Sequence, residues 1–174
     1  VLTKKFTIYP DGHYDLTVSS TNDKPFFVSN GFRPNVLVDM YAVHGFITKL
    51  NDNSLTTIED GSSKKNETFV GSKFVSNFDR YYATVIYNFE KSLQVTVMPD
   101  SSNNPQSFIH SSGNISFSGY MGPKNHRVLE SLNPELIDVI DYGWFTFIAK
   151  PMFVLLQFLQ GYIGNWGWTI VALT

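Results

Sequence analysis

The 174-residue sequence contains no cysteine, which excludes disulfide bonds, thiol catalysis and thiolate metal sites. It also lacks any concentration of basic residues: no basic stretch is longer than Lys64–Lys65, and the formal net charge is -2. Because phosphate binding needs a concentrated cationic surface, we expect no nucleic acid among the partners. Hydrophobic residues make up 43% of the chain and aromatic residues 16%, so the composition excludes a disordered chain.

Sequence motifs typical of catalytic, metal or phosphate-binding sites are absent as well. None of the histidines (His13, His44, His110 and His126) pairs with another histidine or an acid at metal-ligand spacing. No Gly-x-Ser-x-Gly elbow and no glycine-rich phosphate loop is present. We therefore predict no catalytic activity, no bound metal and no cofactor.

Charge is scarce at one end of the chain. From Trp144 to Thr174 the only charged side chain is Lys150, whereas charged residues are scattered through everything before it. The chain begins without a methionine or a signal-peptide pattern, and Thr174 ends inside an apolar run. We expect an internal piece of a longer protein, with two unlike parts.

The first part shows the two-residue alternation of apolar and polar side chains that is typical of β-strands. It recurs in Lys5–Ile8, Tyr14–Val18, Leu93–Val97 and Ile115–Ser118, and Asp11-Gly12 supplies a hairpin turn between the first two. Short strands separated by turn residues favour two packed antiparallel sheets. The prediction is a mainly β protein, with an antiparallel β-sandwich over residues 1–122.

A helical connector is predicted over residues 123–143. Residues 124–132 have helical composition, with Pro123 near the first helical position, where its missing N–H costs nothing. Asn133 is the expected N-cap of a second short helix, and Glu135 lies in its first turn.

Residues 144–164 predict an amphipathic membrane-interface segment, in which residues 151–163 form a helix with an unusually narrow polar side. At 100° per residue the polar or small residues fall on one stripe, formed by Lys150, Gln157, Gln160, Gly161 and Gly164. Apolar side chains fill nearly all the rest. Such a helix fits a membrane interface, and the alternative is a helix packed across a sheet of its own domain.

Tryptophan and tyrosine favour the headgroup level of a bilayer, and several flank this helix. The predicted membrane-interface residues are Trp144, Phe145, Phe147, Ile148, Lys150, Met152, Phe153, Leu155, Leu156, Phe158, Leu159, Tyr162, Trp166 and Trp168. Residues 165–174 are uncharged and predict the start of a transmembrane helix, truncated at Thr174.

The same region resembles the YidC membrane-protein insertase family. The similarity lies in Asp141–Phe145, in Ile148–Phe153 and in Gly164–Ile170, with Tyr120–Lys124 resembling the end of that family's last periplasmic strand. The resemblance implies a β-supersandwich facing the periplasm of a Gram-negative bacterium, an interfacial helix, and the second transmembrane helix of an inner-membrane protein. It implies no hydrolysis and no cofactor.

Such proteins insert and help to fold membrane proteins, alone or with the Sec translocon. The implied partners are therefore the lipid bilayer, nascent membrane proteins and, as a further candidate, Sec translocon subunits. The family's intramembrane arginine would fall beyond Thr174, so we expect this piece not to perform insertion by itself. Two alternatives stay open: a sugar-binding or mutarotase-like β-sandwich enzyme, and a scaffold that holds partners through a sheet edge or apolar patch.

Overall fold

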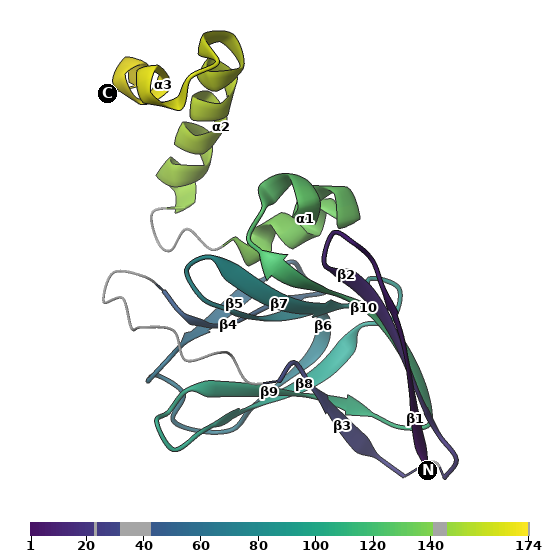
Figure 1. Cartoon of the computed structure of the whole chain (residues 1–174). Helices are drawn as coiled ribbons and strands as arrows, with labels where there is room; N and C mark the ends of the chain where they lie inside the picture. Colours follow the sequence, from purple (N-terminus) through teal and green to yellow (C-terminus); the bar gives the residue numbers. More distant parts are fainter. Residues whose placement is uncertain (23, 32–42, 141–145, 174) are drawn as a thin grey trace. The chain divides into compact units, whose positions relative to one another are not determined.

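The computed structural model describes residues 1–22, 24–31, 43–140 and 146–173, which form two compact units, Val1–Val139 and Ile140–Thr174 (Figure 1). The first unit contains the strands β1 (Leu2–Ile8), β2 (His13–Ser20), β3 (Phe26–Ser29), β4 (Gly45–Leu50), β5 (Leu55–Glu59), β6 (Glu67–Phe78), β7 (Tyr82–Tyr87), β8 (Leu93–Pro99), β9 (Pro105–Ser111) and β10 (Asn114–Pro123). It ends with α1 (His126–Leu132) and the 3₁₀ helix η1 (Pro134–Val139), and the second unit contains α2 (Thr146–Ile163) and α3 (Trp166–Leu173).

All strand pairs are antiparallel, and β6 joins the two halves of the sheet. The second half of β6 pairs with β7, which leads through β10 and β2 to β1. The first half of β6 pairs with β8, which leads through β9 to β3. The strands β4 and β5 continue the sheet from the other edge of β6. The predicted mainly β, sandwich-like fold is therefore confirmed, although the two layers are parts of one curled sheet.

The inner core lies between these two halves of the sheet. Its buried residues come from strands of both halves, and are Leu16, Val18, Phe46, Val75, Ile86, Leu93, Val95, Val97, Ile109 and Phe117. The alternation in Tyr14–Val18 and Leu93–Val97 thus indicated the correct strands. The predicted turn at Asp11-Gly12 is also confirmed, because β1 and β2 pair on either side of it and Gly12 has a φ of 88°.

A second buried layer lies on the opposite face of the central strands. Ile47, Phe74 and Val85 each adjoin an inner-core residue in sequence, so the alternation of a strand turns them to the other face. They are nevertheless fully buried, because the helical segment α1–η1 packs there and contributes three fully buried residues of its own, Leu129, Leu136 and Val139.

The start of α1 differs from the prediction. Pro123 is the last residue of β10, and the N-cap is Asn125, whose side chain accepts hydrogen bonds from the N–H groups of Arg127 and Val128. The placement of Pro123 near the first helical position was wrong, because the β10–β7 ladder continues through Pro123 opposite Tyr82. The cap predicted at Asn133 is confirmed: its side-chain oxygen accepts a hydrogen bond from the N–H of Glu135 at 2.8 Å.

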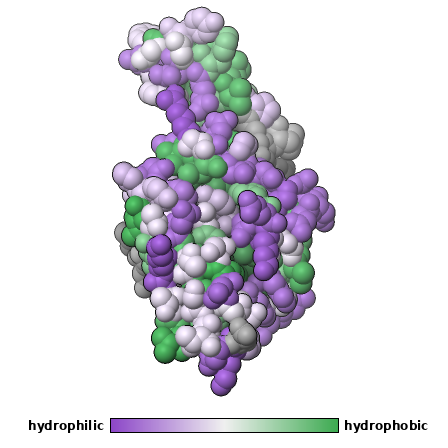
Figure 2. All heavy atoms as spheres, turned by 90° about the vertical axis from the view of Figure 1, so that its right-hand side faces the viewer, coloured by the Kyte–Doolittle hydropathy of each residue, from purple (hydrophilic) through white to green (hydrophobic). Residues whose placement is uncertain are grey.

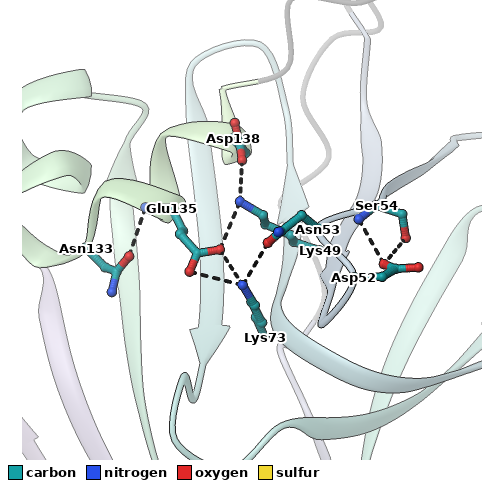
Figure 3. Close-up of polar contacts among 8 residues, drawn as sticks. All are labelled: Lys49, Asp52, Asn53, Ser54, Lys73, Asn133, Glu135 and Asp138. Carbon is teal, nitrogen blue, oxygen red and sulfur yellow. Dashed lines mark hydrogen bonds and ion pairs between the residues drawn. The ribbon is translucent and has the colours of Figure 1, made fainter.

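Two lysines of the sheet form a charged cluster with η1 (Figure 3). The Nζ atom of Lys49 lies 2.9 Å from both Glu135 Oε2 and Asp138 Oδ2, and the Nζ atom of Lys73 lies 2.8 Å from Glu135 Oε2. Burial acts to lower the pKa of Lys49, but its bonds to the two carboxylates outweigh burial and raise that pKa. Hydrogen bonds from Lys73 and Lys49 hold the pKa of Glu135 below its usual value.

This shift predicts an acid-sensitive contribution to stability. A carboxyl group whose pKa is lower in the folded chain stabilises the fold above its unfolded pKa, and the contribution is lost as the pH falls through the folded pKa. Glu135→Gln should lower the free energy of unfolding at pH 7 by about 1 kcal/mol, a value reduced for partial exposure. Urea unfolding of variant and parent should show the full difference above the ordinary glutamate pKa of 4.5, and a smaller one as the pH falls below that value. Glu90→Gln, at an exposed position, is the control, and a difference for Glu135→Gln that is independent of pH would contradict the assignment.

Candidate membrane-contact site

The helix α2 begins at Thr146, earlier than the prediction that placed its start at Pro151. Pro151 lies inside the helix, where its missing N–H removes one i→i−4 hydrogen bond. Because Pro151 is close to the start of the helix, most of the backbone hydrogen bonds of α2 form after this residue. The residues that follow Pro151 carry no charge as far as Thr174. This uncharged stretch provides the candidate site.

The apolar side of α2 is exposed. Val154, Leu155, Phe158 and Tyr162 fall within about 100° of one another around the helix, and their exposed fractions are 64%, 44%, 60% and 79%. Phe158 and Tyr162 also contact each other, with ring centroids 5.0 Å apart. A helix of a protein surrounded only by water normally buries such a side.

Two glutamines of the polar stripe have the opposite character. Gln157 and Gln160 lie on the other side of the helix from Leu155 and Phe158, and both are half-buried. The two amide side chains are thus better covered than Phe158 and Tyr162. This inversion of the ordinary arrangement indicates that the exposed side of α2 is suited to a nonpolar surrounding.

A two-residue joint separates α2 from α3. Gly164 has a φ of 69°, a left-handed conformation that suits glycine at a helix C-terminus, and its N–H donates to the carbonyl of Gln160 at 2.8 Å. Asn165 then caps α3: its side-chain oxygen accepts from the N–H of Gly167 at 2.9 Å. The buried Thr169 donates its hydroxyl to the carbonyl of Asn165 at 2.7 Å.

The helix α3 continues the exposed apolar surface. Trp166 and Trp168 are 51% and 69% exposed, and Ile170 and Val171 are also exposed. The two helices contact each other, so their exposed residues belong to one compact unit. Figure 2 shows a green area along one side of this unit, whereas hydrophobic residues on the viewed face of the β unit lie as separate spots among hydrophilic ones.

The predicted interface residues fall into four groups. Exposed in the structure are Met152, Leu155, Phe158, Tyr162, Trp166 and Trp168, and half-buried are Phe153, Leu156 and Leu159. Trp144 and Phe145 lie outside the described residues, and for Phe147, Ile148 and Lys150 the structure describes only helical backbone. The prediction omitted Val154, Ile163, Ile170 and Val171, which are also exposed and which the uncharged run after Lys150 could have indicated.

Among the described residues, no helix combines the length and the apolar character that a membrane crossing requires. The described part of α3 has eight residues. The predicted transmembrane start over residues 165–174 therefore stays a prediction.

The β unit was also searched for reactive groups. Within the described ranges, no three histidine or acidic side chains gather in a way that could hold a metal ion. Asp15 accepts hydrogen bonds from Ser118 at 2.6 Å and from Tyr9 at 3.1 Å, and His13 lies 3.7 Å from the same carboxylate. The serine donates directly to the acid, so this histidine is not placed between them as a general base would be.

A curled antiparallel sheet followed by helices that expose their apolar sides defines a mainly β domain with an apolar helical segment. Comparison with known proteins makes this class more specific. Residues 34–155 match the family model described as the YidC periplasmic domain. The chain belongs to the YidC family.

Three curated relatives share most of this chain. The membrane protein insertase YidC of Campylobacter jejuni is 46% identical over 173 residues, and that of Wolinella succinogenes is 46% identical over 175. A membrane protein insertase YidC of Helicobacter pylori is 37% identical over 182 residues. Each match covers 99% of this chain and 33% of the relative, so the chain spans about a third of their length. These comparisons give no support to the sugar-binding alternative.

The joint between α2 and α3 yields a prediction. Asn165→Ala removes the side-chain acceptor of the α3 cap, which should cost about 1 kcal/mol of local helix stability. Amide hydrogen exchange at Gly167 and Trp168 should become roughly fivefold faster. Asn165→Asp keeps an acceptor at the same place and should exchange like the parent. Equal exchange in Asn165→Ala and the parent would show that the cap does not stabilise α3.

Proposed function

We propose that this chain is the periplasmic β domain of a membrane-protein insertase together with the segment that attaches it to the bilayer. The relatives named membrane protein insertase YidC support the first half of this proposal. The exposed apolar side of α2 supports the second half, and is the observation on which the proposal depends. The protein resides in the bacterial inner membrane, with this part facing the periplasm.

The energetic argument concerns exposed area. Leu155, Phe158 and similar side chains would each contribute roughly 1.5–3 kcal/mol on full burial. Several such residues lie within two turns of α2, so contact with the hydrocarbon boundary would stabilise the bound state considerably. Trp166 and Trp168 suit the headgroup level because their rings are amphipathic.

The domain boundaries follow from this assignment. Residues 1–122 form the periplasmic β domain, 123–143 the connector, 144–164 the interface segment and 165–174 the start of a transmembrane helix. In this arrangement Lys150 extends toward lipid headgroups from the polar edge of the segment.

The proposed role is not enzymatic. The chain holds and positions the β domain beside the site of insertion, and nascent membrane proteins are the clients of the whole protein. Sec translocon subunits are a further proposed partner. The carboxylate contacts of Asp15 and Glu135 are internal to the β unit, which supports a structural role for these acids.

A charge-placement experiment tests the membrane contact. Leu155→Glu combined with Phe158→Glu puts two charges on the exposed apolar side of α2. Binding of the chain to vesicles of phosphatidylethanolamine and phosphatidylglycerol, measured by co-sedimentation, should fall at least about tenfold, because two apolar contacts of roughly 1.5–3 kcal/mol each are lost. The thermal midpoint of the β unit should remain unchanged.

The matched control adds the same charge on the other side of the helix. Gln157→Glu combined with Gln160→Glu should reduce vesicle binding much less, because these residues lie on the polar stripe. Equal loss for both pairs would mean that net charge alone governs binding. A large drop in the thermal midpoint for Leu155→Glu with Phe158→Glu, with no vesicle binding by the parent, would assign α2 to the core of a water-soluble domain.

A further inference from the structure

The segment α1–η1 is attached to the sheet at both ends. At its start, the N–H of Lys124 donates to the carbonyl of Tyr81 at 2.7 Å, and the Tyr120 hydroxyl donates to the carbonyl of Pro123 at 2.7 Å. At its other end, the charged cluster joins η1 to two neighbouring strands. The η1 helix ends at Val139, and the helical unit begins at Ile140.

A β-bulge places the second lysine of this cluster. Lys49 of β4 pairs with Phe74 of β6, but the next residue, Leu50, pairs with Ser72, so Lys73 has no partner in this ladder. An extra residue of this kind changes the direction of a side chain. Lys73 thereby reaches the same carboxylate as Lys49 (Figure 3).

The cluster is specific in its geometry. Both carboxylate oxygens of Glu135 contact Lys73 Nζ, at 2.8 and 3.2 Å, while Lys49 bridges Glu135 and Asp138. Asn53 supplies a further acceptor for Lys73 at 2.8 Å. The side chains of the two lysines are only 10% and 20% exposed, so these contacts are shielded from much of the solvent.

We infer that Lys49 and Lys73 are positioning residues, which fix η1 on the sheet so that the membrane-contacting helices start from a defined point of the β unit. The inference rests on the proposed function of α2. Leu136 and Val139 also hold η1 on the sheet, because their side chains are buried there. Apolar burial has no preferred direction, however, so it alone would allow η1 to slide along the sheet. Charge pairs with fixed partners define one register and one orientation of the 3₁₀ turn.

The first test is local and needs no membrane. In Lys49→Met, and separately in Lys73→Met, amide exchange at Leu136–Val139 should become roughly ten- to a hundredfold faster, because charged hydrogen bonds are lost. Exchange in β7 and β8 should stay close to that of the parent. Lys49→Arg keeps a cation and should restore slow exchange, and Lys65→Met is the control at an exposed position.

The second test measures the consequence for the point at which the helical unit starts. The absence of cysteine allows spin labels at Lys65→Cys and at Ile140→Cys, the residue that directly follows η1. Distances between the labels, taken with and without phosphatidylethanolamine–phosphatidylglycerol vesicles, should form a narrow distribution in the parent and in Lys49→Arg. Lys49→Met should broaden it.

The outcomes separate the two proposals. Equal acceleration of amide exchange in η1 and in the strands would mean that the charged cluster stabilises the whole β unit and does not position η1 in particular. This result would overturn the inference. Release of η1 with an unchanged distance distribution would also overturn it. Loss of vesicle binding by the parent would count against the proposed function, and the exchange and the distances without vesicles would still decide the positioning role.

Discussion

The pairing of β6 with two different strands along one edge is the constraint on which the β unit depends. β7 occupies the part of this edge from Phe74 to Phe78, and β8 occupies the part from Glu67 to Ser72. Each of these strands leads into a separate half of the sheet. The two halves can face one another and enclose a core only because one strand belongs to both.

The two units differ in whether their apolar side chains are buried or exposed. The β unit covers both faces of its central strands, the inner one with the opposing half of the sheet and the outer one with α1 and η1. The helical unit leaves Phe158 and Trp168 exposed and half-covers Gln157 and Gln160. Water is a suitable surrounding for the first surface and a poor one for the second.

Local patterns predicted the parts of this fold that depend on near neighbours. Alternation indicated β2 and β8, and Asp11-Gly12 indicated the first hairpin, because both signals act within a few residues. The shared edge of β6, the bulge at Lys73 and the continuation of β10 through Pro123 arise from pairing between distant segments, which no local pattern contains. For the candidate site, composition indicated the apolar side of α2, but the interface role of its residues remains a prediction.

The pairing of β2 with β10 also sets an order of events during synthesis. The hydrogen bond between Ser118 and Asp15 joins residues 103 positions apart, and among the described strands β10 is the only other neighbour of the first hairpin. At a synthesis rate of about 5–20 residues per second, roughly 5–20 s pass before that neighbour exists. For this interval β2 has one open edge, with Leu16 and Val18 uncovered. During synthesis the growing chain therefore exposes a hairpin with an unpaired strand edge and apolar side chains. Both stay exposed until β10, one of the last strands of the β unit, has been made.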